Sequence, residues 1–382
     1  MMIKARLRSF LAAFRVSKTK SLDEVKNIHL FCSKQIYIRM VKILFTGATG
    51  YIGSSAVSAF LDHPKRDAFE ITALVRDANK AEKLKQFNIT PVVGSHLYGP
   101  LFEKLASETD VLIACADSDH PDAANYALKG LKKRFEETGV PPIFIHTASR
   151  TGVLADNALG AFTSNVVYHD DEPDQIETLP PDALHRDIEL MIIDADKAGY
   201  VKTYIISPST IWGYPTHKLA KTGITRRHSH QIPLLINTSL KRGNGGIFNK
   251  GLNIWDNVNT DELGLLYARV YDAAVSNPNA GHGREGIYFG RGDEYMWKDL
   301  SKAVAQALYE IGKGHSSEPT EFTPEEVEKT FGFVARFLGC NSRSTARRAL
   351  STGWNPKLKT GDMLAYIKDE VNYLLAEGDG HH

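Results

Sequence analysis

The chain has 382 residues, of which 42% are hydrophobic and 24% charged, as is usual for a soluble globular protein with one large or two modest domains. Its 46 basic and 45 acidic residues give a net charge of +1, so the charge balance gives no reason to expect nucleic acid or an anionic membrane as a partner. The three cysteines are too few and too widely spaced for a disulfide framework or a metal site, which favours a reducing compartment, and no run approaches the roughly 18 consecutive apolar residues of a membrane-spanning helix.

The first 39 residues differ in composition from the rest of the chain. Residues 1–22 contain six Lys or Arg and no acidic residue, with Leu and Phe between them, a composition that resembles a mitochondrial presequence. The alternatives are an unstructured leader, or a start upstream of a true first residue at Met40, where a strand-like run begins. We therefore expect a cytoplasmic protein, or a mitochondrial one if residues 1–22 act as a presequence.

From Val41 onward, apolar strand-like runs alternate with helical patterns. The runs cover residues 41–46, 70–75, 90–93, 110–114, 142–146 and 201–206. Helical patterns lie between most of them, for example at 54–61 and 125–138. This alternation predicts an α/β fold with a doubly wound parallel sheet of the Rossmann type, covered by helices on both faces.

The pattern changes after Pro215. Residues 216–256 are polar and irregular, and helices are expected at 261–276, 297–311 and 362–376, with a further helix start at 323–329. We predict a leader at 1–39, an NAD(P)-binding domain at 40–215 to which 252–290 return, and a smaller substrate-binding part built from 216–251 and 291–382.

A glycine-rich turn follows the first strand. Gly47, Gly50 and Gly53 are spaced as Gly-x-x-Gly-x-x-Gly between a buried strand and a helix. In a dinucleotide site the first glycine permits the tight turn, the second lets the backbone approach the diphosphate, and the third lets helix and strand pack closely. The amide groups of Thr49, Tyr51 and Ile52 and the start of the helix would then face the phosphates. The turn predicts a dinucleotide cofactor.

The end of the second strand distinguishes NADP from NAD. Arg76 follows this strand, and an arginine here accommodates a 2′-phosphate, so NADP is the expected cofactor, with Lys80 or Lys83 in support. The neighbouring Asp77 keeps NAD as the alternative, because an acid here bonds the ribose hydroxyls. The alternative is that Arg76 is a solvated residue at a strand end and binds no phosphate.

These features resemble the extended or atypical short-chain dehydrogenase/reductase family, which includes nucleotide-sugar epimerases and dihydroflavonol-type reductases, and also uncharacterised fungal epimerase/dehydratase proteins. The resemblance runs from about Met40 to Val371 and rests on the glycine turn and on four further segments: Ala114-Cys115-Ala116, Ser207-Pro208 through Gly213, Trp255 through Leu263, and Ala346 through Pro356. It implies the Rossmann fold with a C-terminal substrate part, and places Ala116 and Pro208 beside the cofactor.

The catalytic pair of that family is replaced in this chain. Where the resemblance implies the Tyr and Lys of Tyr-x-x-x-Lys, the sequence has His185 and Glu189. Four-residue spacing predicts that both lie on one helix face, so that His185 transfers the proton and Glu189 orients it. The equally weighted alternative is a surface pair in a protein that has lost this chemistry.

Two further residues are candidates for the substrate site. Ser149 follows the fifth strand at the position of the family's catalytic Ser or Thr, although a serine that bonds local backbone is the alternative. Tyr214 follows the turn after strand six and is expected to reach the substrate cleft, while the Tyr-x-x-x-Lys strings at 214–218 and 309–313 lie too late in the chain to be the family's pair.

Some polar clusters have simpler interpretations. His228 and His230 lack a third ligand, so no metal is expected, and Arg226 with Arg227 is either a clamp for a substrate phosphate or a solvated loop. Asp117, Asp119 and His120 follow the fourth strand at the cleft and are expected to cap the helix that begins near Pro121, with lining of the nicotinamide end as the alternative.

The sequence thus predicts an NAD(P)-dependent oxidoreductase or epimerase acting on a small carbonyl or alcohol. The alternatives are a non-catalytic NmrA-like dinucleotide sensor and a redox-neutral isomerase or cyclase. A small-molecule substrate is the expected partner and a homodimer stays open, whereas nucleic acid and membranes are not expected partners.

Overall fold

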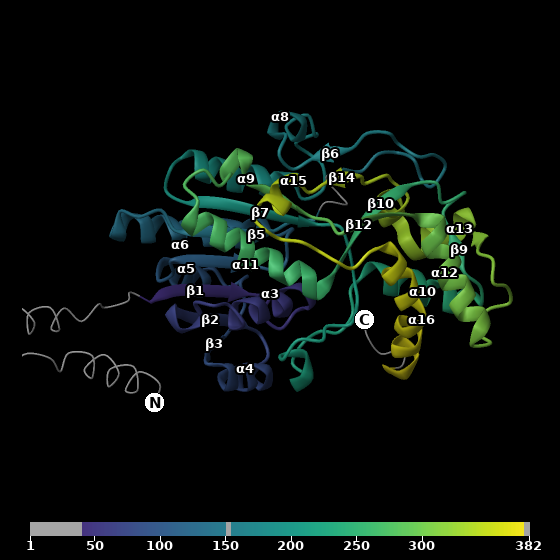
Figure 1. Cartoon of the computed structure of the whole chain (residues 1–382), viewed down its shortest axis with the longest axis horizontal. Coiled ribbons are helices and arrows are strands. Elements are labelled where there is room, and N and C mark those ends of the chain that lie inside the picture. The colour runs from purple at the N-terminus through teal and green to yellow at the C-terminus, as the bar shows by residue number, and fades with distance from the viewer. Residues whose placement is uncertain (1–39, 150–153, 378–382) are drawn as a thin grey trace, which may run out of the picture. The chain divides into compact units, whose positions relative to one another are not determined.

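The computed structural model describes residues 40–149 and 154–377, and the expected leader lies outside this range. Seven parallel strands form the central sheet in the order β11-β7-β5-β4-β1-β2-β3 (Figure 1). Their bounds are β1 (Val41–Thr46), β2 (Phe69–Val75), β3 (Ile89–Val93), β4 (Val111–Ala114), β5 (Ile143–Thr147), β7 (Lys202–Pro208) and β11 (Ile287–Gly290). The predicted doubly wound α/β sheet is confirmed, and the strand order reverses between β1 and β4.

Helices cover both faces of this sheet. One face carries α3 (Tyr51–Leu61) and α11 (Thr260–Ser276), and the other carries α5 (Gly99–Ser107), α6 (Pro121–Thr138) and α9 (Arg186–Lys197), while α4 (Ala78–Leu84) follows β2 (Figure 1). The α3–α11 contact is close, because a Cβ on Gly264 would lie 2.5 Å from the backbone of Ser55. Strands β1, β4, β5 and β7 are almost wholly buried, as their continuous apolar runs require in a parallel sheet.

A second apolar cluster lies outside the central sheet. It packs around a three-stranded sheet in the order β12-β10-β8 and includes Trp212, Trp255 and Trp297. The strands are β8 (Thr210–Trp212), β10 (Ile254–Asn259) and β12 (Asp293–Met296), and the helices are α10 (Gln231–Arg242), α12 (Trp297–Glu310) and α16 (Thr360–Glu377). The expectation of irregular structure throughout 216–256 is wrong at α10, where Ile232, Leu235 and Ile236 supply a buried helical face.

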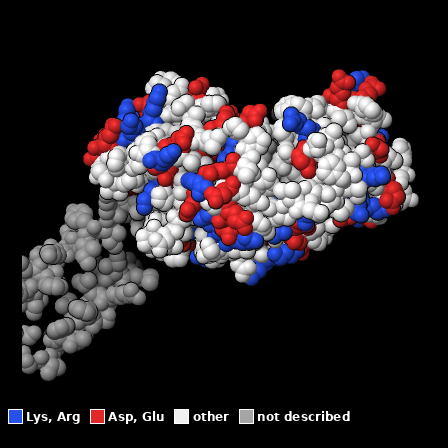
Figure 2. Space-filling view, turned by 90° about the horizontal axis from the view of Figure 1, so that it is seen from above, with Lys and Arg blue, Asp and Glu red and all other residues white. Residues whose placement is uncertain are grey.

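Short elements complete the described chain. Two pairs of short strands are formed by β6 (Tyr168–His169) with β14 (Ser344–Thr345) and by β9 (Gly246–Ile247) with β13 (Thr320–Glu321). The remaining α-helices are α8 (Pro173–Ile176), α13 (Pro324–Glu326), α14 (Ala335–Leu338) and α15 (Arg347–Ser351), and a short 3-10 helix covers Ala220–Thr222. On the face that carries α8 and β6, a broad uncharged area lies between groups of charged side chains (Figure 2). Among residues 40–149 and 154–377, no helix is long and apolar enough to cross a membrane.

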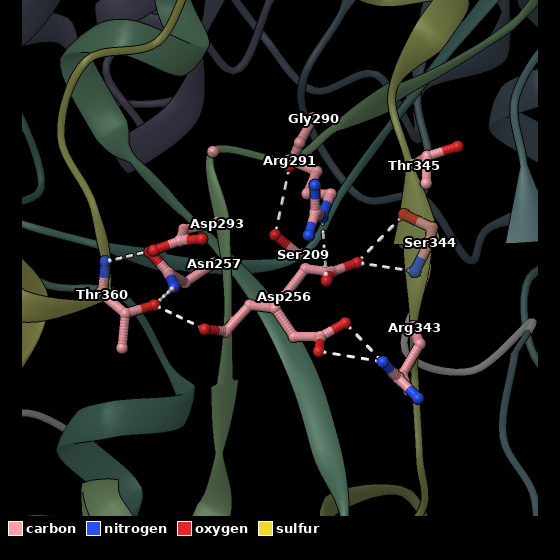
Figure 3. Close-up of polar contacts among 12 residues, drawn as sticks. Ser209, Asp256, Asn257, Gly290, Arg291, Asp293, Arg343, Ser344, Thr345 and Thr360 are labelled. Atoms are coloured by element: carbon pink, nitrogen blue, oxygen red, sulfur yellow. Dashed lines mark hydrogen bonds and ion pairs between the residues drawn. The ribbon is translucent and has the colours of Figure 1, made fainter. Parts of the chain in front are cut away.

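A buried polar network joins the central sheet to the second cluster (Figure 3). The Asp256 carboxylate on β10 is fully buried, accepts hydrogen bonds from the backbone and side chain of Ser344 at 2.9 Å, and pairs with Arg291 at 3.1 Å. The Ser209 hydroxyl, just beyond β7, donates to the Gly290 carbonyl at the end of β11. The carboxyl ends of the outer strands are therefore fixed against the C-terminal part of the chain.

Candidate functional site

The glycine turn has the geometry that the sequence predicted. Gly47 has φ of +70°, and a Cβ on it would lie 2.7 Å from the carbonyl carbon and oxygen of Cys115. A Cβ on Gly53 would lie 2.1 Å from the Gly47 carbonyl oxygen. Both positions therefore require glycine, one for the turn and one for the contact between helix and turn. Ala116, whose amide lies 2.8 Å from the same hypothetical Gly47 Cβ, borders this turn.

The amino end of α3 can receive an anion. Gly50 is the N-cap residue, and no described side chain caps this helix, so the first-turn amides of Tyr51 and Ile52 lack an intrahelical acceptor. The Tyr51 side chain is directed elsewhere, since its buried hydroxyl donates to the Gly213 carbonyl at 2.5 Å. The Thr49 carbonyl accepts a hydrogen bond from the Arg226 amide at 3.1 Å.

A pocket opens where the strand order reverses, between the ends of β1 and β4. Its walls include Thr46, Ala114, Ala116, His96 and His120. Two buried ring nitrogens on these walls form no hydrogen bond in the described chain: His120 Nδ1, and His96 Nε2, which lies 4.0 Å from the Asp117 carboxylate. Open α/β sheets bind dinucleotides at this position, and the bare turn, the free amides and the unbonded His120 nitrogen fit such a ligand.

Two oppositely charged residues, Arg76 and Asp77, follow β2 and have different environments. Asp77 caps α4 by accepting from the amides of Asn79 at 2.8 Å and Lys80 at 3.0 Å. The hydrogen bond from the Lys80 amide, with that from Asn79, lowers the pKa of Asp77 despite the opposing effect of desolvation. Arg76 is exposed directly before this cap. One oxygen of the acid is thus committed to the helix, whereas the Arg76 side chain is exposed to solvent.

An Asp–His pair lies at the same edge of the sheet. Asp119, in the loop after β4, is hydrogen-bonded to Nδ1 of His185 at the start of α9. Burial favours a higher pKa for Asp119, but the hydrogen bond and the attraction of His185 outweigh it, so the pKa of this carboxyl is lowered. Because an ionised carboxylate only accepts hydrogen bonds, Nδ1 of His185 carries the hydrogen and Nε2 is left for a ligand.

Asp119 therefore does not cap α6, and the expectation that residues 117–120 cap this helix is wrong. The N-cap residue is His120, without a side-chain cap, and Asp119 is drawn instead to the imidazole. Asp117 and His185 both have positive φ, at 49° and 73°, which is uncommon for residues other than glycine. Such conformations cluster at functional sites, where surrounding structure holds them.

A second histidine borders this pair. His146 on β5 is 5% exposed, and burial lowers its pKa to about 4, with Asp119 raising it and His185 lowering it. His146 is therefore neutral at neutral pH, and it interacts electrostatically with both members of the pair.

The structure corrects the expected role of Glu189. His185 is the N-cap residue of α9, and the Glu189 carboxylate bonds Arg186 at 3.0 Å, with both partners 2% exposed. Burial raises the pKa of Glu189, while Arg186 lowers it. Glu189 therefore holds the first turn of α9 and does not orient His185, which Asp119 does. The alignment of His185 and Glu189 with the family's Tyr and Lys stays a prediction.

The other predicted residues lie in two places. Ser149 follows the end of β5, and Pro208 ends β7 opposite Gly290 of β11, so both are at the carboxyl edge of the sheet. The structure does not bring Tyr214 to this edge. Its ring packs against Tyr373 of α16, with centroids 4.7 Å apart, and against the guanidinium of Arg227.

A larger pocket begins beside His185. It encloses about 1350 Å³, its open mouth included, and the residues before His185 line it. Its apolar walls are Leu154, Val166, Leu179, Leu184, Phe333 and Phe337. The Arg343 side chain on its wall is committed to Glu294 and to the Ser164 carbonyl. Sequence reasoning missed this pocket because its walls come from segments about 150 residues apart, neither with a motif.

Comparisons of the sequence give two matches. Residues 40–127 match the NmrA-like family. The oxidase ucsJ of Acremonium sp. is 24% identical over 332 residues, which cover 82% of this chain and 92% of that protein.

Comparisons of the structure give nucleotide-sugar enzymes. The dTDP-glucose 4,6-dehydratase of Bacillus anthracis, solved with NAD, has a TM-score of 0.58 at 15% identity and covers 89% of this chain and 97% of that one. UDP-glucose 4-epimerase of Thermotoga maritima, solved with UDP-glucose, has a TM-score of 0.58 at 16% identity and covers 88% of this chain and 99% of that one. DesIV of Streptomyces venezuelae, solved with NAD, has a TM-score of 0.58 at 17% identity and covers 89% of this chain and 98% of that one. At these identities the likeness shows the fold. The likeness confirms the predicted Rossmann-type α/β fold.

Proposed function

We propose that this chain is an NAD(P)-dependent oxidoreductase that interconverts a carbonyl compound and an alcohol. The observation that carries the proposal is the Asp119–His185 pair at the sheet edge that also holds the glycine turn. An oriented imidazole at this edge is a general acid and base, which is what hydride transfer to a carbonyl needs alongside the hydride donor. The NAD bound in two of the similar structures supports a nicotinamide dinucleotide at the turn.

NADP is the preferred form of the cofactor. Arg76 is exposed where the 2′-phosphate of an adenosine ribose would lie, and a guanidinium binds phosphate with two parallel hydrogen bonds. The acid that would favour NAD, Asp77, has one oxygen engaged in capping α4. We expect NADPH to bind more tightly than NADH.

His185, assisted by Asp119, would transfer the proton that the substrate oxygen gains or loses. The reduced nicotinamide, when bound, supplies a hydride to the carbonyl carbon, and the oxygen then needs one proton. In the protonated imidazole of His185, Nε2–H donates that proton, and the Asp119 carboxylate stabilises the positive charge through Nδ1–H. In the reverse direction, neutral His185 takes the alcohol proton at Nε2. Ser149, at the end of β5, would donate a hydrogen bond to the substrate oxygen.

The pocket beside His185 favours a substrate with an apolar body. Leu, Val and Phe side chains form the apolar part of its wall, and Phe333 is 71% exposed toward solvent. Asp156 on the same wall is occupied by hydrogen bonds from Asn341. Asp182 and Arg336 also line the pocket and form no ion pair with described residues, so a ketone or aldehyde with an apolar body and a polar end fits it.

The test is turnover of NADPH by the purified protein. A panel of aromatic, aliphatic and sugar carbonyls is added, and absorbance at the nicotinamide band is followed while products are identified by mass spectrometry. The expected result is NADPH oxidation that matches alcohol formation for an apolar carbonyl. Product without NADPH consumption would instead identify a redox-neutral isomerase.

A dinucleotide sensor is the second candidate. The match to the NmrA-like family covers only residues 40–127, the part that contains the glycine turn, so it favours cofactor binding without a specified reaction. Tight NADPH binding with no turnover across the panel would support the sensor and reject the oxidoreductase.

A further inference from the structure

Residues 213–230, here called the strap, leave the second cluster, extend to α4 and return to the glycine turn. Figure 1 shows this teal segment reaching down to a short helix beside α4. On the outward path, Gly213 accepts from Tyr51, His217 bonds Ser54 at 3.4 Å, and Lys218 pairs with Asp62 at 2.7 Å. At its far end, the Thr222 carbonyl accepts from Lys83 of α4 at 3.4 Å.

The returning half of the strap brings two arginines past the turn. The Arg226 amide donates to the Thr49 carbonyl, which places Arg226 beside the uncapped amino end of α3. The next residues leave the turn, because His228 is held between Glu370 at 3.0 Å and Glu377 at 3.1 Å on α16.

The two arginines differ in their partners. Arg227 lies 3.6 Å from the Glu377 carboxylate, and its guanidinium stacks over the Tyr214 ring, so its charge is already balanced. Arg226 is exposed, and its side chain bonds His230 Nδ1 at 3.3 Å. Burial, with Arg226, lowers the pKa of His230, so this imidazole is neutral and accepts the hydrogen bond. In residues 40–149 and 154–377, no carboxylate forms an ion pair with Arg226.

We propose that Arg226 binds a phosphate group of the dinucleotide. This role rests on the proposed cofactor. An unbalanced guanidinium fixed by its own backbone to a diphosphate-binding turn supplies the cation that this turn lacks, and it forms charge-assisted hydrogen bonds with phosphate oxygens. The ligand of Arg226 is therefore a cofactor phosphate, in contrast to the substrate phosphate that the sequence left as an alternative.

The experiment measures dissociation constants for NADPH and NADH by nucleotide fluorescence in the full chain, Arg226→Gln, Arg226→Lys and Arg227→Gln. Arg226→Gln should weaken binding about 10- to 100-fold, Arg226→Lys less, and Arg227→Gln less than about threefold. An equal loss for both nucleotides assigns Arg226 to the diphosphate, and a loss confined to NADPH assigns it to the 2′-phosphate. Circular dichroism confirms that each variant is folded.

Unchanged affinity of Arg226→Gln for both nucleotides, with the wild type binding them, would overturn the role of Arg226 alone. Equal losses in Arg226→Gln and Arg227→Gln would also overturn it, because the effect would then come from loosening the strap. A wild-type chain that binds neither nucleotide would overturn the proposed cofactor and this role together.

Discussion

The orientation of one imidazole decides whether this chain has a proton donor. Asp119 fixes the tautomer of His185, and the side chain of His185 is 9% exposed, so Nε2 is directed by the protein and not by solvent. The backbone of His185, at φ of +73°, is held by the turn that starts α9. A residue held in this conformation by its surroundings is positioned more tightly than one on a free loop.

Replacing His185 by Gln should lower kcat about 10²- to 10⁴-fold and leave the NADPH dissociation constant unchanged, because only the proton transfer is lost. Asp119→Asn should lower kcat by a smaller factor, since the imidazole remains but its charge is not stabilised. The matched control is His282→Gln, which removes another Asp–His pair, with Asp196 at 2.9 Å near the amino end of β7. Equal kcat in His185→Gln and wild type would reject the catalytic role.

His146 should make the folded state sensitive to acid. Its folded pKa of about 4 lies below the unfolded value of about 6.5, so the unfolded chain binds the extra proton between these values. Stability is therefore lost as pH falls from 6.5 toward 4, by on the order of 3 kcal/mol from this group. Urea unfolding of wild type and His146→Gln at pH 7.5 and 4.5 measures it. A stability difference between the two proteins that is the same at both pH values would contradict the assignment.

Single residues show where sequence reasoning ended. The roles of Gly47 and Gly53 follow from their spacing, because a turn between strand and helix is local. The partner of His185 could not be found in this way, since Asp119 lies 66 residues earlier and the contact depends on α6 packing against α9. The sequence around Asp119, directly before Pro121, is instead typical of a helix cap.

Helix α9 begins with a buried ion pair. Arg186 and Glu189 are spaced three residues apart in its first turn, and both are almost completely buried. A buried pair of this kind adds little net stability, but the loss of one partner leaves an uncompensated charge in the interior. The pair fixes the turn that directly follows His185.

Glu189→Gln should therefore destabilise the protein by about 3 kcal/mol or more, measured by urea unfolding. The control is Glu177→Gln, which removes a carboxylate from the exposed pair with Arg284 and should cost less than about 1 kcal/mol. Similar losses in the two variants would show that the Arg186–Glu189 pair does not hold this turn.

Helices and strands in which apolar residues recur at a regular spacing could be predicted from the sequence. The six expected strands and the helices now labelled α3, α6, α11, α12 and α16 occur within a few residues of their predicted bounds. Strand β11 and helix α10 were not predicted. β11 is four residues long and lies among glycines, and the apolar face of α10 follows a polar, glycine-containing stretch that dominated the interpretation.

In the whole molecule, two apolar clusters meet at the candidate site. One surrounds the seven-stranded sheet and the other surrounds α10, α12 and α16, and the strap and the Asp256 network join them. The glycine turn belongs to the first cluster. The pocket beside His185 is lined by residues from 154–184 and from 333–343. The exact division at residues 215 and 251 stays a prediction.

The proposed function requires a nicotinamide dinucleotide at the glycine turn, and calorimetric titration of the full chain with NADPH and NADH measures this binding directly. Wild type should bind both, NADPH more tightly. Gly50→Ala should stay folded, because its Cβ would lie 3.1 Å from a single carbonyl oxygen, that of Gly47, yet it should bind at least about tenfold more weakly, since this Cβ stands where the diphosphate approaches. No heat of binding with either nucleotide, or equal affinity in folded Gly50→Ala, would contradict the account.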